Sequence, residues 1–206
     1  MHPDIAEWPN RMFYSREQLQ PVPLPHQQEP TTEPRLVFLP SQDASHSSYG
    51  SYSSYSEKVN PSEARIVAEE LKKVFLEYEQ RRGGFSPDKT VGVIVPYRNQ
   101  IATIRRELER LGIPALQRVS IDTVERYQGS QRDVIIYATT VTRPYQLDFL
   151  CANTFEEDGH LIDRKLNVAV TRARCRLVVV GHEPTLRQAP LYASLLDHIA
   201  AQGSVS

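Results

Sequence analysis

The sequence predicts an α/β domain in which a doubly wound, mostly parallel sheet carries helices on both faces. Short runs rich in β-branched apolar residues, at 91–95, 133–140 and 176–181, are typical of strands that are buried on both sides. A helical pattern separates them, as in residues 99–111, where apolar side chains recur on one face. Strands that alternate with helices in this way indicate a parallel sheet.

The first third of the chain contains segments that favour no regular structure. Residues 3–14 predict a short amphipathic helix and residues 35–39 a short strand, and a proline-rich connector joins them. Residues 41–56 are almost all Ser, Tyr, Gly and small polar types, and such a tract buries too little apolar area to offset its ordering entropy. We expect a mobile insertion there, although tyrosines that recur every third residue leave base stacking open.

From residue 61 onward the predicted elements alternate regularly. Pro61 begins a long helix that runs to about residue 82 and is closed by Gly83 and Gly84. The elements that follow are the strand 91–95, the helix 99–111, the strands 119–121 and 133–140, the helix 163–174, the strand 176–181 and a last helix at 191–201. Because such sheets bind ligands beyond the carboxyl ends of their strands, polar residues next to the strands are the candidate site residues.

Composition narrows the class of protein. Residues 1–90 carry 10 Lys and Arg against 13 Asp and Glu, whereas residues 91–206 carry 14 against 12, and all but one of these 14 are arginine. This favours planar recognition of phosphate or carboxylate by the C-terminal part.

Cys151 and Cys175 lack the spacing of a zinc site or a disulfide framework, and no apolar run reaches transmembrane length. We expect a soluble, cytoplasmic protein with no metal site of its own and no membrane partner.

Three polar segments lie next to predicted strands. Pro96, Tyr97 and Asn99 follow the first buried strand, where the proline ends the strand and a helix begins. The segment 121–136 contains Arg-Tyr-Gln-Gly-Ser-Gln-Arg-Asp ahead of the next long strand. The segment 167–174 reads Asn-Val-Ala-Val-Thr-Arg-Ala-Arg at the predicted end of a helix. Guanidinium groups anchored between a helix and a buried strand suit a rigid reach toward phosphate, although an arginine-rich helix end is equally consistent with a solvated surface.

Taken in this order, the segments resemble motifs IV, V and VI of the second RecA-like motor domain of Upf/Dna-type superfamily 1 helicases. Pro-Tyr-x-x-Gln at 96–100 resembles motif IV, Tyr-Gln-Gly-x-Gln-x-Asp at 127–133 motif V, and Leu-Asn-Val-Ala-x-Thr-Arg-Ala-Arg at 166–174 motif VI. The start of the chain resembles the linker that follows the first motor domain. The resemblance implies a RecA-like fold of the P-loop NTPase type, with linker helix and connector at 1–34 and the second motor domain at 35–206.

The resemblance implies an ATP site built by the second and third segments. Arg172 resembles the arginine finger that reaches the γ-phosphate across the cleft between two motor domains, and Arg174 resembles a supporting residue. Gln128 and Gly129 resemble the turn that approaches the nucleotide, where glycine permits close approach. Gln131 stands where the family usually carries glutamate, so an amide replaces a charged contact to the nucleotide or to a neighbouring arginine.

The resemblance also implies a track for single-stranded DNA or RNA. Thr123 and the helix start at Tyr97, with its neighbours Pro96 and Asn99, resemble contacts to the backbone of the strand. A hydroxyl and free helix N–H groups suit a phosphate there.

Part of an ATP-hydrolysing site is not encoded in this sequence. It contains no Gly-x-x-x-x-Gly-Lys-[Ser/Thr] segment, and no acidic pair suited to Mg²⁺ follows a buried strand. The resemblance places those parts on a first RecA-like motor domain, in the parent protein or in a neighbouring chain. We expect an ATP-dependent helicase in combination with that domain. The alternatives are a truncated or split-gene fragment that binds single strands weakly without hydrolysing ATP, and a remnant with no activity.

Overall fold

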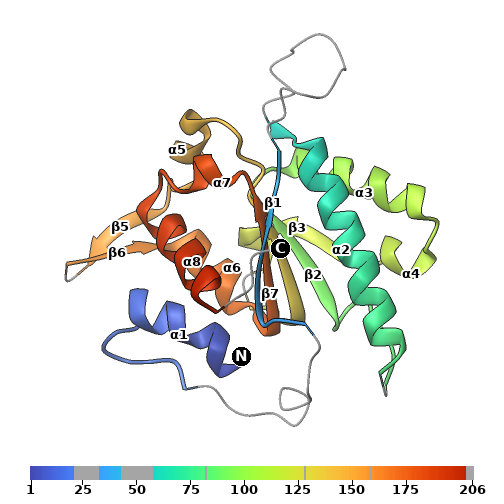
Figure 1. The fold of residues 1–206 in the computed structure, drawn as a ribbon, viewed down its shortest axis with the longest axis horizontal. Coiled ribbons are helices and arrows are strands. Elements are labelled where there is room, and N and C mark those ends of the chain that lie inside the picture. Colours follow the sequence, from blue (N-terminus) through green and yellow to red (C-terminus); the bar gives the residue numbers. More distant parts are fainter. Residues whose placement is uncertain (21–32, 43–57, 82, 128, 158, 203–206) are drawn as a thin grey trace.

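The computed structural model describes residues 1–20, 33–42, 58–81, 83–127, 129–157 and 159–202. Within these residues, a parallel five-stranded sheet has the order β1-β7-β4-β2-β3. Its strands are β1 (Leu36–Pro40), β2 (Val91–Val95), β3 (Ser120–Thr123), β4 (Arg132–Ala138) and β7 (Ala173–Gly181). Strand β7 lies inside the sheet, between β1 and β4 (Figure 1). The parallel order confirms the doubly wound α/β fold and is consistent with a RecA-like architecture.

Helices cover both faces of the sheet. Helices α2 (Pro61–Glu79), α3 (Arg98–Leu111) and α4 (Pro114–Gln117) lie on one face (Figure 1). The other face carries α1 (Pro3–Met12), α5 (Leu147–Leu150), α6 (Arg164–Thr171), α7 (Glu183–Leu186) and α8 (Pro190–Ala201). The first turns of α2 and α6 are capped by the side chains of Asn60 and Asp163, which accept hydrogen bonds from backbone N–H groups.

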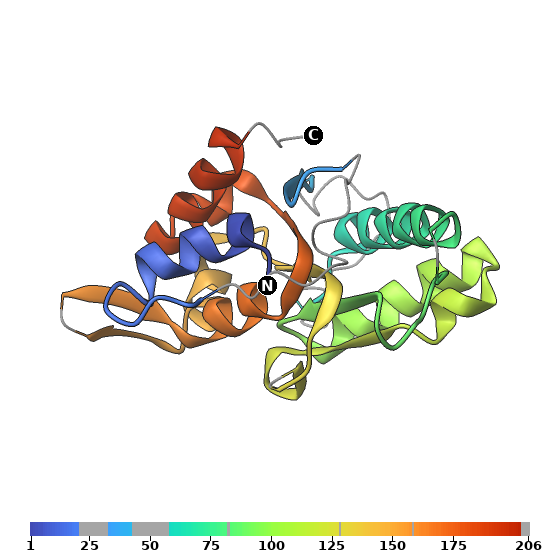
Figure 2. The ribbon, with the colours of Figure 1, turned by 90° about the horizontal axis from the view of Figure 1, so that it is seen from below.

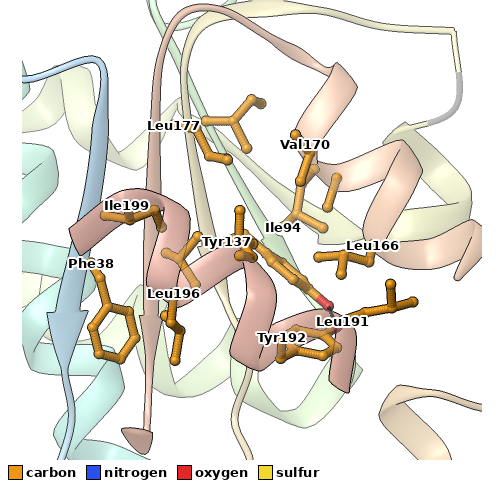
Figure 3. Packing of buried hydrophobic residues seen from close by; sticks show 14 of the residues in the cluster. Phe38, Ile94, Tyr137, Leu166, Val170, Leu177, Leu191, Tyr192, Leu196 and Ile199 are labelled. Carbon is orange, nitrogen blue, oxygen red and sulfur yellow. Dashed lines mark hydrogen bonds between the residues drawn. The ribbon is translucent and has the colours of Figure 1, made fainter. Parts of the chain in front are cut away.

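Alternate residues of each strand face the two helix layers, so the sheet separates two apolar cores. On β4, Ile135 and Tyr137 face the core beneath α1, α6 and α8, whereas Ile136 faces the core beneath α2 and α3. Figure 3 shows the first of these cores, where the hydroxyl groups of Tyr137 and Tyr192 lie 2.8 Å apart. Full burial of one aliphatic side chain, such as that of Ile135, stabilises the folded protein by about 1.5–3 kcal/mol. Because helices cover both faces of the sheet, side chains on both sides of the inner strands are apolar. This explains the continuous apolar runs in the sequence.

Helix α1 packs into the same body as the sheet. Trp8 is fully buried, and its indole N–H donates to the hydroxyl of Ser194 on α8 at 3.1 Å. The backbone N–H of His2 donates to the carbonyl of Arg174 on β7 at 2.7 Å. Figure 2 shows α1 lying beside α8 and above the hairpin and α6. The start of the chain therefore contacts the strand and the helix that carry the third polar segment.

The end of the predicted helix 163–174 differs in the structure. Helix α6 ends at Thr171, Arg172 is its C-terminal cap residue, and Arg174 belongs to β7. The helix stops where the Arg172 carbonyl accepts a hydrogen bond from the backbone N–H of Arg132 at 3.1 Å, because pairing between β4 and β7 begins there. The prediction that both arginines lie on the helix end is therefore wrong, and the strand begins at residue 173 rather than 176.

Ser41 departs from the predicted mobile insertion at 41–56. It is buried, and its backbone N–H donates to the carbonyl of Gly181 at 2.8 Å, so the chain continues beside β7 past the end of β1. The rest of that tract, from residue 43 on, and most of the proline-rich connector lie outside the described residues. The strand 91–95 has the predicted bounds, and the bounds of the other predicted elements differ by at most three residues, as element ends commonly do.

The region 144–163 holds short elements that the sequence pattern did not predict. A single 3₁₀ turn, η5 (Pro144–Gln146), leads into α5, and β5 (Thr154–Glu157) and β6 (His160–Asp163) form an antiparallel hairpin. A further 3₁₀ turn, η4 (Val124–Tyr127), follows β3. No helix in the described part of the chain is long and apolar enough to span a membrane. Cys151 and Cys175 are both free thiols.

Candidate functional site

The residues predicted to contact nucleic acid converge at the carboxyl ends of β2 and β3. Pro96 directly follows β2, and Thr123 is the last residue of the neighbouring strand β3, with which Val95 is in register. Tyr97 is the N-terminal cap residue of α3, and Asn99 lies in the first turn of that helix. All four predicted residues line one open groove of about 430 Å³.

This groove, which we call the β2–β3 groove, carries an excess of positive charge. Lys58, Arg98 and Arg126 line it, and Glu125 is the carboxylate among its described lining residues. Arg126 also forms an ion pair with Asp122 at 3.7 Å. An open surface that combines guanidinium groups with the start of a helix is suited to phosphate.

Thr123 is already engaged within the protein. It is buried, and its hydroxyl donates to the Glu125 carboxylate. Partial burial raises the pKa of Glu125, but this hydrogen bond, one from its own backbone N–H, and the charges of Lys165 and Arg98 together lower that pKa below its ordinary value. A phosphate at Thr123 therefore has to compete with an ionised carboxylate for the hydroxyl.

A buried polar network that the sequence analysis did not identify supports the groove. Gln100 of the first polar segment accepts from the backbone N–H of Asn60 at 2.8 Å and donates to its carbonyl at 2.9 Å, which ties the start of α3 to the start of α2. Fully buried Glu63 accepts from the backbone N–H of Thr140 at 2.7 Å and from the hydroxyl of Ser41 at 3.5 Å. These contacts join the ends of β1 and β4 to α2. The sequence signal that could have identified this network was the Pro-Tyr-x-x-Gln segment at 96–100, which contains Gln100.

The environment of Glu63 is unusual for a carboxyl group. Burial raises its pKa from 4.5 to about 8, although hydrogen bonds from Thr140, Ser41, Thr139 and Asn60 oppose that rise. The donor at Thr140 is held with φ at +63°, a left-handed conformation that costs a β-branched residue on the order of 1–3 kcal/mol. The carboxyl group thus fixes an otherwise unfavourable backbone turn at the end of β4.

The residues predicted to contact ATP lie at the opposite, amino-terminal edge of the sheet. Gln131 directly precedes β4, and Arg174 is the second residue of β7. The Nε of Arg174 donates to Gln131 Oε1 at 3.4 Å, and its Nη1 lies 3.8 Å from Asp133 Oδ1. The structure therefore brings the second and third polar segments together. The arginine that the Gln131 amide contacts is Arg174.

Arg172 has a different environment. Its side chain is half-buried, and its Nη2 donates to the hydroxyl of Thr171 at 3.1 Å. Its Nε is buried, and no hydrogen-bond acceptor meets it within the described residues. A half-buried guanidinium at the end of a helix can meet an anionic ligand such as a phosphate.

The turn between η4 and β4 has the geometry expected of a close approach. Gly129 adopts φ of +85° and is exposed, and no side chain or backbone atom within the described residues lies where its Cβ would be. Gln128 lies outside the described residues, so its predicted role stays a prediction. Tyr127 is buried, and its hydroxyl donates to the Ser120 carbonyl at 2.8 Å. The turn is thus anchored by a tyrosine on one side and open on the other.

An aromatic pair in the β2–β3 groove was also missed. Tyr97 and Phe149 stack with ring centroids 4.7 Å apart and planes inclined by 17°. Phe149 lies in α5, whose four residues are too few to give a periodic pattern, and its side chain is 44% exposed. The Nζ of Lys165 lies 4.4 Å from the Phe149 ring centroid. A charged groove with an exposed aromatic surface can bind a ligand that carries both negative charge and flat rings.

The described part of the chain contains no cluster of three or more His, Cys, Asp or Glu side chains that could hold a metal ion.

Residues 1–184 match the AAA domain family. The chain is 32% identical over 69% of its length to the "DNA replication ATP-dependent helicase/nuclease DNA2" of Mus musculus. It is 28% identical over 96% of its length to "Regulator of nonsense transcripts 1" of Dictyostelium discoideum, and 25% identical over 96% to "Putative helicase mov-10-B.1" of Danio rerio. It spans only 12%, 14% and 20% of the length of these relatives, respectively.

Proposed function

The chain belongs to the AAA domain family and is a Upf/Dna-type superfamily 1 helicase domain, and from this premise we propose that it is the second motor domain of an ATP-dependent helicase. In this role it supplies an arginine finger to ATP hydrolysis and part of the track for a single strand of DNA or RNA. It works with a first RecA-like motor domain, in the same polypeptide or in a neighbouring chain.

The observation that carries the proposal is the convergence of Pro96, Tyr97, Asn99 and Thr123 on the β2–β3 groove. Three of these residues follow β2 and the fourth ends β3, yet all four share one surface with three cations. Phosphate contacts of this kind position a nucleic acid without reading its sequence. The groove is therefore suited to a track along which a strand of any sequence moves.

The residues at the opposite edge support the nucleotide half of the proposal. ATP and Mg²⁺, when bound, supply the transferable γ-phosphoryl group and neutralise its developing charge. Arg172 would then donate to the γ-phosphate from its position at the end of α6. Arg174 holds the strand start in place through Gln131, and the open turn at Gly129 lets the nucleotide approach the backbone. An arginine in this role contributes roughly 10³–10⁵ in rate.

A first motor domain is the partner that this proposal requires. The phosphate cradle and the Mg²⁺ ligands belong to that domain, since these 206 residues contain no Gly-x-x-x-x-Gly-Lys-[Ser/Thr] segment. The second candidate function is a module that binds single strands without hydrolysing ATP, which the β2–β3 groove alone would support. The two candidates differ in one measurable property, which is ATP turnover in the presence of a first motor domain.

The test compares ATP turnover by the 206-residue chain with turnover by a polypeptide that carries a first motor domain ahead of residue 1. We expect background turnover from the chain alone, and turnover stimulated by single-stranded nucleic acid in the two-domain polypeptide. Arg98→Ala combined with Arg126→Ala should remove the stimulation. The matched control is Arg106→Ala with Arg110→Ala, which removes the same charge from α3 outside the groove. Binding of single strands without any turnover would favour the second candidate.

A further inference from the structure

Two of the cations that line the β2–β3 groove come from separate segments of the chain. Lys58 lies in the segment that precedes α2, whereas Arg98 is the first residue of α3. Phosphates of one strand are spaced by the sugar backbone that joins them, so two cations that meet neighbouring phosphates need a fixed spacing of their own. That spacing depends on a contact that joins the start of α2 to the start of α3.

The side-chain amide of Gln100 provides this contact by pairing with the backbone of Asn60 through both of its polar groups. Gln100 Oε1 accepts from the backbone N–H of Asn60 at 2.8 Å, and Gln100 Nε2 donates to the Asn60 carbonyl at 2.9 Å. Both residues are 0% exposed, so water does not compete for these bonds. Asn60 is itself held in place, because its side chain caps α2 by accepting from the backbone N–H of Glu63 at 3.1 Å.

Each of the two cations lies close to one member of this pair. Lys58 precedes Asn60 by two residues, and Arg98 precedes Gln100 by two residues. Two residues of chain span at most about 7 Å, so neither cation can move far from its end of the pair. Gln100 is fully buried and lies outside the described lining of the groove, so it acts on a bound strand only through other residues.

We propose that Gln100 is a positioning residue for nucleic acid, which holds Lys58 and Arg98 at the spacing that lets both neutralise phosphates of one strand. This inference rests on the proposed nucleic-acid function and specifies how the groove aligns its phosphate contacts. It separates Gln100 from Tyr97 and Asn99 of the same polar segment, since those two side chains line the groove. Loss of the Gln100–Asn60 pair therefore removes the contribution of Lys58 to binding, although the Lys58 side chain is still present.

The test measures the affinity of the 206-residue chain for a labelled homopolymeric single strand across a salt series. Gln100→Met keeps an unbranched side chain of similar length but cannot form the two hydrogen bonds with Asn60. We expect it to lower affinity by the same factor as Lys58→Ala, and each variant to flatten the salt slope from about −2 to about −1.4. Lys58→Ala combined with Gln100→Met should bind no more weakly than Lys58→Ala alone, because Gln100 acts through Lys58.

Asn10→Leu is the matched control, because the Asn10 amide makes the same two kinds of hydrogen bond with the backbone of Leu19. Its Nδ2 donates to the Leu19 carbonyl at 3.0 Å, and its Oδ1 accepts from the Leu19 N–H at 2.6 Å. This pair joins the end of α1 to the turn that follows it and lies outside the groove. Asn10→Leu should lower the thermal midpoint without changing affinity or the salt slope.

Thermal melts establish that each variant keeps the fold. If Gln100→Met unfolds, Gln100→Asn takes its place in the same comparison, since it keeps an amide but is one methylene too short to make both bonds. An unchanged salt slope, or losses of affinity that multiply when the variant is combined with Lys58→Ala, would overturn the positioning role and leave phosphate binding in place. Absence of salt-sensitive binding by the wild-type chain would overturn the proposed nucleic-acid function itself.

Discussion

Gln131 and Arg174 meet side chain to side chain at the amino-terminal edge of the sheet, where Arg174 Nε donates to Gln131 Oε1 at 3.4 Å. This contact bridges the starts of β4 and β7, and Asp133 adds an ion pair at 3.8 Å. Arg172, two residues earlier, donates to Thr171 of its own helix and has a buried Nε that no described acceptor meets. Two arginines that lie two residues apart in the sequence thus have different surroundings, and we expect different roles.

In a polypeptide with a first motor domain, Arg172→Ala should lower ATP turnover by roughly 10³–10⁵ while ATP binding changes only a few-fold. The reason is that a finger acts mainly on the transition state. Arg172→Lys should remain poor, because an ammonium lacks the planar fork. Arg174→Ala should cost about 0–1 kcal/mol of stability and less turnover, since its side chain is 36% exposed. Steady-state kinetics and thermal melts on each variant measure both effects. Equal, small losses for Arg172→Ala and Arg174→Ala would mean that both are surface charges.

Gly92→Ala should destabilise the pairing of β2 with β3. A Cβ at this position would lie 2.3 Å from the Tyr127 hydroxyl oxygen and 2.9 Å from Cζ of the same ring. The Tyr127 ring, which anchors the turn between η4 and β4, therefore has to move. Overpacking of this kind costs about 1–3 kcal/mol. Tyr127→Phe removes the nearest atom, and although it also loses the bond to the Ser120 carbonyl, it should recover part of the loss when combined with Gly92→Ala. Denaturant unfolding of both single variants and the double variant measures this coupling, and strictly additive losses would contradict it.

The stability of the chain should fall as pH rises from about 4.5 to about 8, in part because of Glu63. The unfolded chain leaves this carboxyl near its ordinary pKa of 4.5, whereas burial raises the pKa to about 8 in the folded protein. The protonated group therefore contributes fully below about pH 4.5, and its contribution is lost as pH passes through 8, with a slope of up to about 1.4 kcal/mol per pH unit.

Glu63→Gln removes this titration but keeps a side chain of the same shape. The measurement is the free energy of unfolding at several pH values, and the quantity compared is the difference between wild type and variant. We expect that difference to change in favour of the variant as pH rises from 4.5 to 8. A difference that is constant with pH would show that Glu63 keeps an ordinary pKa in the folded chain.

Binding of single strands by the 206-residue chain should depend strongly on salt. Each neutralised phosphate of a single strand contributes a slope of about −0.7 to the dependence of log affinity on log salt. Three groove cations, Lys58, Arg98 and Arg126, therefore predict a slope of about −2. Arg98→Ala with Arg126→Ala should flatten it to about −0.7, whereas the Arg106→Ala and Arg110→Ala pair should leave it unchanged. Fluorescence anisotropy across a salt series gives these slopes, and tight binding that ignores salt would contradict them.

The sheet was predictable from sequence because its strands are covered on both faces. The apolar runs of β2, β4 and β7 follow directly from the two cores that they separate. The hairpin of β5 and β6 was not predictable in the same way, because its strands are half-exposed and only four residues long. The end of α6 was misjudged because an alternative partner, the backbone of Arg132, competes for the Arg172 carbonyl, and that partner is 40 residues away. Such long-range competition leaves no local signature.

The residues of the candidate site also divide into those that could be predicted from the sequence and those that could not. Residues inside a motif, such as Pro96 and Thr123, could be placed next to strand ends and then found in one groove. Phe149 could not, because nothing near it in sequence repeats and its significance comes only from stacking on Tyr97. Glu63 was overlooked because a carboxylate in the first turn of a helix is usually a solvated partner of the helix dipole, and its burial depends on Thr140 and Ser41.

The interior position of β7 has a consequence for the order in which this protein can fold during synthesis. Strand β7 is translated after β1, β2, β3 and β4, yet it is the strand that joins β1 to β4. Until residues 173–181 leave the ribosome, β1 and β4 each present an unpaired edge and uncovered apolar faces, which are the features that promote aggregation of nascent chains. Helix α1, although translated before the sheet, has to wait for Ser194 of α8 before its buried tryptophan finds its hydrogen-bond partner. Closing these long loops is slow, so we expect the exposed strand edges to persist until β7 has been translated.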